Sequence, residues 1–233
     1  MKRIALVTGA NKGIGFAIAQ QLADSGLDVI VGARDEAHGR AAAARISGAR
    51  FVRIDVTSAE SIRAAVSALD ALDVLVNNAG IADPHDGSAT TAPLDVVRRT
   101  FDVNFFGAVE VTQAMLPLLK RSSAGRIVNM SSSLGSLSLE RKLQALAYRS
   151  SKAALNMFTV TLAQALADTR IKVNSAAPGY TLTDLNRHLL QPGWTPPPGQ
   201  TVEEAARVPV RLALLADDGP TGGFFDRDGA ITW

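Results

Sequence analysis

The chain has 233 residues, of which 47% are hydrophobic and 20% charged, a composition typical of one soluble globular domain with a substantial core. Its formal net charge of +2 gives little support to a nucleic-acid or membrane-surface function. The absence of cysteine excludes disulfides and thiolate metal sites.

Hydrophobic runs along the chain are short. None approaches the ~20 residues of a membrane span, and the run after Met1-Lys2-Arg3 is shorter than the core of a signal peptide. The three histidines are far apart and share no metal-ligand spacing. We therefore expect a cytoplasmic protein with no metal site.

Short apolar segments alternate with helical patterns. Strands are expected at 4–7, 27–31, 51–54, 74–76, 126–130 and 172–176, and helices at about 16–26, 36–46, 58–69, 93–120 and 144–168. Parallel strands need such crossover helices, so the alternation predicts an α/β fold with helices on both faces of a parallel sheet.

A glycine-rich turn separates the first strand from the first helix. Gly9, Gly13 and Gly15 would let backbone amides approach a diphosphate, and the helix N-terminus would supply oriented N–H groups. An ordinary glycine-rich loop is the alternative, but the strand–turn–helix context favours dinucleotide binding.

The end of the second strand bears on the choice of dinucleotide. A carboxylate there would bind the ribose 2′-hydroxyl of NAD, but this chain has Ala33 followed by Arg34. The guanidinium of Arg34 suits a 2′-phosphate, and Lys12 in the turn adds a second cation. These residues predict NADP(H), although solvated surface charges beside Asp35 would explain them too.

Two further strand ends carry polar residues. Asp55, followed by Val56, could accept from the adenine amino group or cap the next helix. Asn77-Asn78-Ala79-Gly80 closes the fourth strand at the edge of the sheet where such folds bind ligands.

Tyr148 and Lys152 are four residues apart on an expected helix and therefore share one face. A nearby ammonium lowers the pKa of a phenol, so the pair could act as a proton donor or acceptor near neutral pH. The same spacing also occurs by chance on solvated helices.

A proline-rich stretch, 191–199, is the one break in composition. We expect an ordered substrate loop at about 184–205 rather than a linker. Leu185, Leu189, Leu190 and Trp194 could form its apolar lid, or could pack in the core.

Four motifs together resemble the classical short-chain dehydrogenase/reductase family over essentially the whole chain. They are Thr8-Gly9 with Gly13-Ile14-Gly15, Asn77-Asn78-Ala79-Gly80, Tyr148 with Lys152, and Pro178-Gly179. The turn and the Ala33-Arg34-Asp35 stretch look most like the NADPH-dependent carbonyl reductases. The resemblance implies a single Rossmann-like, doubly wound NADP(H)-binding domain with a mostly parallel seven-stranded sheet.

The family's site residues map onto this sequence one by one. Asn104, Ser132, Tyr148 and Lys152 match the catalytic positions, with Ser131 and Ser133 as rivals of Ser132. The expected cofactor residues are Gly9, Asn11, Lys12, Gly13, Ile14, Gly15, Arg34, Asp55, Val56, Asn78, Ala79, Gly80, Tyr148, Lys152, Pro178, Gly179, Thr181 and Thr183. Helix capping is an alternative for Thr183.

The resemblance implies reduction of a small, apolar ketone or aldehyde by NADPH. Ser132 would bind the carbonyl oxygen, Tyr148 would donate the proton, Lys152 would lower the phenol pKa, and Asn104 would position a water. The partner is a small molecule, with a homo-oligomer possible. Alternatives are a 3-oxoacyl-thioester reductase that docks an acidic carrier protein, and a cofactor-sensing regulator.

One interval departs from the pattern of the larger carbonyl reductases. Ser132 and Tyr148 are much closer in sequence than in relatives with a large insertion before the tyrosine. We expect a small pocket wall at 137–146.

Overall fold

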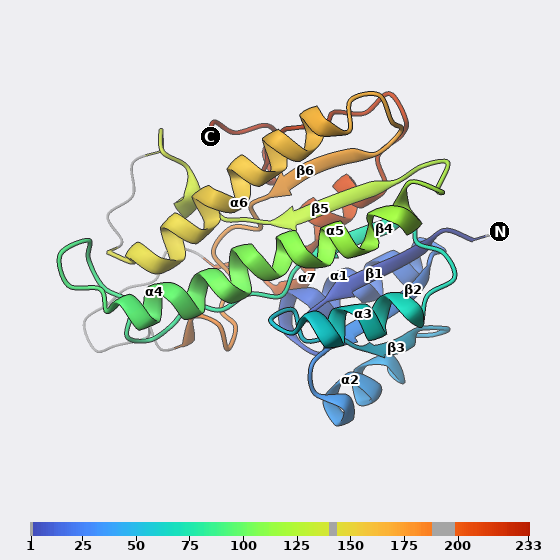
Figure 1. The fold of residues 1–233 in the computed structure, drawn as a ribbon, viewed down its shortest axis with the longest axis horizontal. Helices are drawn as coiled ribbons and strands as arrows, with labels where there is room; N and C mark the ends of the chain where they lie inside the picture. Colours follow the sequence, from blue (N-terminus) through green and yellow to red (C-terminus); the bar gives the residue numbers. More distant parts are fainter. Residues whose placement is uncertain (1, 140–143, 188–198) are drawn as a thin grey trace.

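The computed structural model describes residues 2–139, 144–187 and 199–233. Its centre is a seven-stranded sheet in which every neighbouring pair is parallel (Figure 1). The strands are β1 (Ile4–Thr8), β2 (Asp28–Ala33), β3 (Arg50–Arg53), β4 (Val74–Asn77), β5 (Arg126–Met130), β6 (Lys172–Ala176) and β7 (Phe224–Phe225). The expected doubly wound α/β fold is confirmed.

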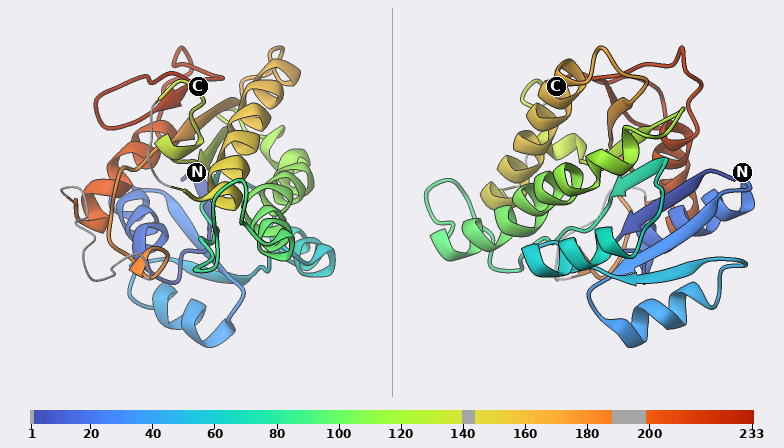
Figure 2. Two further views of the ribbon diagram at one scale, coloured as in Figure 1. Left: turned by 90° about the vertical axis from the view of Figure 1, so that its left-hand side faces the viewer. Right: turned by 45° about the vertical axis from the view of Figure 1, so that its right-hand side comes forward.

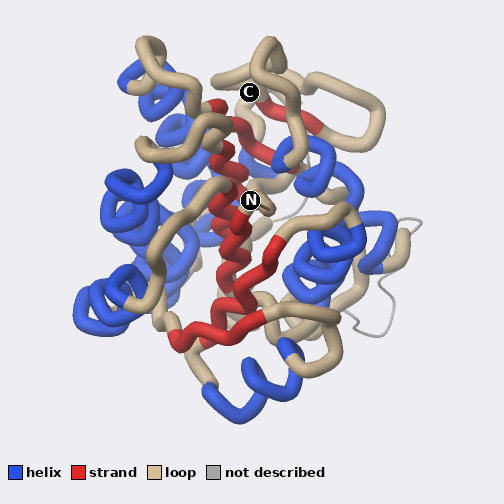
Figure 3. The backbone as a smooth tube through the Cα atoms, turned by 90° about the vertical axis from the view of Figure 1, so that its right-hand side faces the viewer, coloured by secondary structure: helices blue, strands red, loops and turns tan. Residues whose placement is uncertain are grey.

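Helices cover both faces of this sheet (Figures 2 and 3). They are α1 (Gly13–Asp24), α2 (Glu36–Ala43), α3 (Ala59–Ser67), α4 (Leu94–Phe101), α5 (Gly107–Leu119), α6 (Leu146–Ala165) and α7 (Val202–Ala213). Side chains alternate along a strand, so Val7 of β1 packs in the core beneath α1, α2 and α7, whereas Leu6 packs with α3, α5 and α6.

The strand order β3-β2-β1-β4-β5-β6-β7 reverses direction between β1 and β4. In open α/β sheets, ligands bind in the crevice beyond the carboxyl ends of the strands at such a reversal. The glycine-rich turn follows β1, and Asn78-Ala79-Gly80 follows β4, so the fold brings the two motifs together.

The helix expected at 93–120 is interrupted by a π-helical segment, Asp102–Phe106, between α4 and α5. This wider turn carries Asn104, and π segments are frequent at functional sites. Hydrophobic periodicity does not distinguish a π turn from an α-helix, so the sequence predicts one continuous helix here.

Helix α7 was also missed, and it begins inside the range expected for the substrate loop. Thr201 accepts from the backbone N–H of Glu204, and the Glu204 carboxylate accepts from the backbone N–H of Thr201. This capping box fixes the helix start, despite Pro209 in its interior. The described parts of the expected loop before the helix are therefore 184–187 and 199–201, and Leu189, Leu190 and Trp194 lie outside the described residues.

Candidate active site

Hydrogen bonds fasten the turns after β1 and β4 to each other. The Thr8 hydroxyl accepts from the backbone N–H groups of Asn78 and Ala79, both at 3.0 Å. The Asn78 amide in return donates to the carbonyl oxygens of Thr8 (2.8 Å) and Gly9 (3.2 Å). The polar strand end therefore braces the glycine-rich turn.

The turn leaves the N-terminus of α1 open. Lys12 at the N-cap makes no side-chain cap, and the first turn of α1 contains no acidic residue. Gly13 has φ +58°, a conformation that favours glycine. A Cβ on Gly15 would lie 2.3 Å from the Asn78 amide nitrogen, so only glycine permits this packing. Oriented, uncapped N–H groups with no acid beside them suit an anionic diphosphate.

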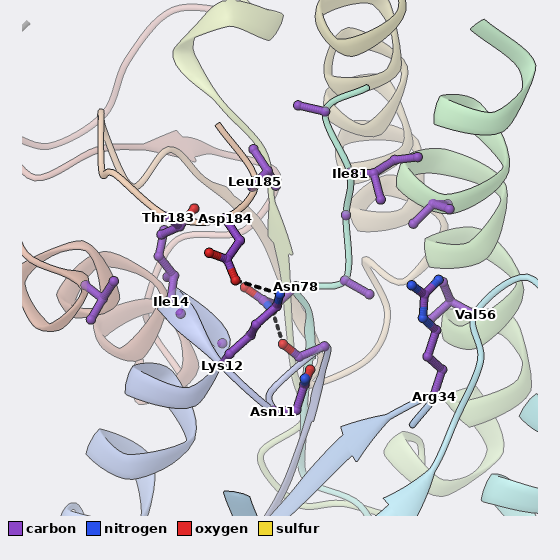
Figure 4. Close-up of a pocket in the computed structure, with 18 of the residues that line it drawn as sticks. Asn11, Lys12, Ile14, Arg34, Val56, Asn78, Ile81, Thr183, Asp184 and Leu185 are labelled. Carbon is purple, nitrogen blue, oxygen red and sulfur yellow. Dashed lines mark hydrogen bonds and ion pairs between the residues drawn. The ribbon is translucent and has the colours of Figure 1, made fainter. Parts of the chain in front are cut away.

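A cavity of about 560 Å³ lies against this cradle (Figure 4). Thirteen of the expected cofactor residues line it, from the turns after β1, β2, β3 and β4 and from the segment after β6: Gly9, Asn11, Lys12, Gly13, Ile14, Gly15, Arg34, Asp55, Val56, Asn78, Ala79, Gly80 and Thr183. The segment after β6 also contributes Leu182, Asp184, Leu185 and Arg187, of which only Leu185 was anticipated as a pocket residue.

The two cations expected at the 2′-phosphate lie apart. Arg34 lies near Asp55, whose pKa its charge lowers, whereas Lys12 extends to Asp184 (Figure 4). The Lys12 ammonium is 2.8 Å from one Asp184 oxygen, and Arg187 is 3.3 Å from the other. The Asp184 carboxylate therefore competes with a phosphate for Lys12. It lies 172 positions later in the sequence, so the glycine-rich turn alone gives no sign of it.

Asp55 does not cap the helix that follows it. Ser58 is the N-cap of α3, accepting from the backbone N–H of Ser61 at 3.2 Å. The Asp55 carboxylate instead accepts from the backbone N–H and hydroxyl of Thr57, and these bonds, with a smaller contribution from the charge of Arg34, lower its pKa. The capping alternative for Asp55 is therefore wrong.

Tyr148, Ser132 and Lys152 meet around a second cavity, of about 650 Å³, which shares six lining residues with the first. The Ser132 hydroxyl lies close enough to the Tyr148 phenol to influence its pKa. The Lys152 ammonium lies 5.6 Å from the centre of the Tyr148 ring and donates to the Met130 carbonyl oxygen at 2.8 Å. Ser132 follows β5, and Tyr148 lies 16 positions later in α6, so the packing of α6 against the end of β5 brings the three groups together.

Burial governs the ionisation of this group. It raises the pKa of the Tyr148 phenol, while the hydrogen bond with Ser132 acts in the opposite direction. Burial also lowers the pKa of Lys152, whose residue is 5% exposed, to about 8. The groups that shift the phenol pKa in the ligand-free protein do not include Lys152, so the expected effect of Lys152 on Tyr148 stays a prediction.

Ser132 is the serine that faces Tyr148 among the three candidates. Its oxygen also accepts from the backbone N–H of Leu134, which starts a short 3-10 turn, Ser133–Gly135. The buried Ser131 hydroxyl instead donates to the backbone carbonyl oxygen of Lys152 at 3.4 Å.

Asn104 is 1% exposed and lines neither cavity. Its side-chain oxygen accepts from the backbone N–H of Ile81 at 2.8 Å, and its amide donates to the Ile81 carbonyl oxygen at 2.9 Å and to Ser151 at 3.1 Å. The side chain thus clamps the segment after β4, a contact that sequence analysis did not anticipate.

The segment after β6 completes the wall between the cavities. Pro178, Gly179 and Thr181 line the second cavity, and Thr183 lines both. The Thr183 backbone N–H donates to the Asn186 side-chain oxygen at 2.9 Å within a turn, so Thr183 caps no described helix. Asp83, Pro84 and Asp86, after β4, also line the second cavity and were not anticipated.

This combination of a diphosphate cradle at the sheet reversal with a phenol, a hydroxyl and a buried ammonium around the adjoining cavity defines a dinucleotide-dependent oxidoreductase. Residues 3–192 match the short chain dehydrogenase family. The chain belongs to that family.

Relatives with established names agree with this assignment. The chain is 33% identical to (-)-isopiperitenone reductase of Mentha piperita, covering 99% of this chain and 98% of the relative. It is 34% identical to carbonyl reductase [NADPH] 1 of Bos taurus, with 99% and 98% covered. The NADPH-bound carbonyl reductase from chicken fatty liver superposes with a TM-score of 0.85 at 29% identity, covering 100% of this chain and 99% of that one.

The Mentha alignment spans 318 positions against the 233 residues of this chain, so that relative carries segments that this chain lacks. The expected resemblance to carbonyl reductases is confirmed. Across the described residues, no helix is long and apolar enough to cross a membrane, and no three His, Cys, Asp or Glu side chains are grouped as metal ligands would be.

Proposed function

We propose that this protein is an NADPH-dependent reductase of a small, apolar ketone or aldehyde, with Tyr148 as the proton donor. The observation that carries the proposal is the placement of Ser132, Tyr148 and Lys152 around one cavity, which shares lining residues with the cavity at the dinucleotide cradle. Membership of an oxidoreductase family, with NADPH-bound and NADPH-named relatives, supports the cofactor.

The first cavity fits NADP(H) on its own chemistry. The open N-terminus of α1 would hold the diphosphate, and Arg34 at the end of β2 would hold the 2′-phosphate in place of the acid that selects NAD. Lys152 and Tyr148, which line the second cavity, would hold the nicotinamide ribose. NADPH supplies the hydride when it is bound.

The protein's own residues would stabilise charge and move a proton. As charge grows on the carbonyl oxygen, the Ser132 hydroxyl donates a hydrogen bond to it, and the Tyr148 phenol donates the proton. Because burial raises the pKa of Tyr148, the phenol is protonated at neutral pH and ready to donate. Lys152 stabilises the phenolate that remains, and the Asn104 clamp on Ile81 holds the neighbouring segment in place.

The lining of the second cavity favours an uncharged, largely apolar substrate. Met130, Leu134 and Leu185 line it, while its carboxylates already have partners. Asp83 is bound by Arg99 at 3.0 Å and Asp86 by backbone N–H groups at 2.9 Å, so neither awaits a cationic substrate.

Replacing Tyr148 by Phe tests the proposal. The Tyr148→Phe variant should bind NADPH as the wild type does and lose turnover by about 10²–10⁴-fold, the usual contribution of general acid catalysis. NADPH oxidation against a panel of ketones, aldehydes, quinones and acyl thioesters measures turnover and separates ketone reduction from thioester reduction. Wild-type turnover in this variant would refute the mechanism.

A further inference from the structure

The helix that carries Tyr148 and Lys152 begins without a cap of its own. Ala145 occupies the N-cap of α6, with φ −151° and ψ 76°, and offers no side-chain acceptor. The first backbone N–H groups of any helix lack partners inside it and need acceptors from elsewhere. In α6 one of them belongs to Tyr148, the third residue of the helix.

Two residues some sixty positions earlier in the chain supply these acceptors. The Gly87 carbonyl oxygen accepts from the Leu146 N–H at 2.8 Å. The two oxygens of Asp86 accept separately from the N–H groups of Ala147 and Tyr148, both at 2.9 Å. A carboxylate at a helix N-terminus also interacts favourably with the helix dipole.

The segment that supplies this cap is anchored independently. The Gly87 N–H donates at 2.8 Å to Asp86 Oδ1, the same oxygen that accepts from Ala147, and this bond orients the carboxylate. Upstream, Asn104 clamps Ile81, and Asp83 is held by Arg99 of α4 at 3.0 Å. The start of α6 is thus tied through residues 81–87 to α4 and the π segment, and α4 packs directly on α6.

We infer that Asp86 is the positioning residue for the proton donor: its carboxylate fixes the first turn of α6 so that the Tyr148 hydroxyl meets that of Ser132. This inference rests on the proposed function. Tyr148 lies in α6 and Ser132 follows β5, so the approach of their hydroxyls across the second cavity depends on where the first turn of α6 lies. Helix ends fray when their N–H groups lack acceptors, and small misplacements of a catalytic group cost rate steeply.

A competing role for Asp86 is direct contact with the substrate, because it also lines the second cavity. The two roles differ in what they depend on. Positioning acts only through the Tyr148 hydroxyl, whereas substrate contact acts whether or not that hydroxyl is present.

The test uses Asp86→Ala and Asp86→Asn, with Ser58→Ala as a matched control. Ser58 caps α3 and lines neither cavity, so its loss removes a helix cap without touching α6. At a temperature well below the unfolding midpoint, Asp86→Ala should lower kcat at least about tenfold with unchanged NADPH affinity, since misplacement costs rate rather than cofactor binding. Asp86→Asn keeps one acceptor oxygen and should lose less, and Ser58→Ala should keep wild-type kcat.

The same substitutions are then made in the Tyr148→Phe background. If Asp86 acts through Tyr148, they cause no further loss of the residual rate. Amide hydrogen exchange should also speed up at residues 146–148 in Asp86→Ala. Wild-type kcat and exchange in Asp86→Ala, or an equal fold-loss in both backgrounds, would overturn the inference. Failure of the proposed function appears separately, as full turnover in Tyr148→Phe alone.

Discussion

Ser132 shows how far one residue's role depends on its neighbours. Three consecutive serines follow β5, and alignment with the family pattern assigns the catalytic position to Ser132. The structure supplies a physical reason for this choice: the Ser132 hydroxyl is close enough to Tyr148 to influence its pKa, whereas the Ser131 hydroxyl donates to the backbone carbonyl oxygen of Lys152.

Alanine substitutions along this run make the distinction measurable. Ser132→Ala removes the hydrogen-bond donor at the site of developing charge and should lower kcat by about 10²–10³-fold, as the loss of an oxyanion donor does elsewhere. Ser131→Ala and Ser133→Ala should retain far more activity. Steady-state kinetics with one ketone measure kcat for the three variants. A greater loss of kcat in Ser131→Ala than in Ser132→Ala would assign the hydrogen-bond donor to Ser131 instead.

Residue properties that depend on local spacing were predictable from the sequence, whereas those that depend on burial or on distant partners were not. The four-residue spacing of Tyr148 and Lys152 predicted that they share one face of a helix, and both line the second cavity. The sign of the Tyr148 pKa shift was not predictable, because it depends on burial, which no local pattern reports. Asp86 gave no signal at all, since its partners lie 61 and 62 positions away.

At the scale of elements, the long α-helices and central strands were predictable because their hydrophobic periods are strong and local. The π segment within the expected helix, the two-residue strand β7 and helix α7 were not found. A π turn keeps the helical pattern, and two residues carry no period. The Thr201–Glu204 capping box was the available signal for α7.

The end of β2 allows a prediction at this scale. Ala33→Asp combined with Arg34→Ser restores a carboxylate where NAD-binding folds carry one and removes the phosphate-binding guanidinium. NADPH affinity should fall by about 10- to 100-fold, the loss expected for one or two charge-assisted hydrogen bonds, while NADH affinity rises.

Arg40→Ser is the control for this pair. Arg40 lies on the helix after β2, pairs with Glu36 at 2.8 Å and does not line the cofactor cavity. Arg40→Ser removes one positive charge, as Arg34→Ser does, but the ratio of the NADPH and NADH dissociation constants should not change. A similar change in that ratio for Arg40→Ser would show a general charge effect and contradict the phosphate-site assignment.

For the molecule as a whole, the buried ammonium of Lys152 is a cost to stability. Its pKa in the folded protein is about 8 against an ordinary value of 10.5. Below pH 8 both folded and unfolded states are protonated, so the cost is fully present. Between pH 8 and 10.5 the unfolded state binds more protons, and the free energy of unfolding therefore rises with pH.

Lys152→Met removes that cost and gives the whole-molecule prediction. The stability of the wild type relative to the variant should rise by up to roughly 3 kcal/mol as pH increases through this window. Denaturant unfolding at a series of pH values measures it, with Lys120→Met as the control for losing an exposed positive charge. If the difference in free energy of unfolding between wild type and Lys152→Met does not change with pH, the lowered pKa of Lys152 is contradicted.

The ion pair between Lys12 and Asp184 has a consequence for ionic strength. Its side chains are 66% and 55% exposed, so solvent screens the pair and it contributes little to stability. Under the proposed assignment, NADPH draws Lys12 to its phosphate and releases Asp184, exchanging one surface ion pair for another. Added salt screens both pairs, and the two effects oppose each other. The affinity for NADPH therefore depends less on salt than the number of cations lining its cavity suggests.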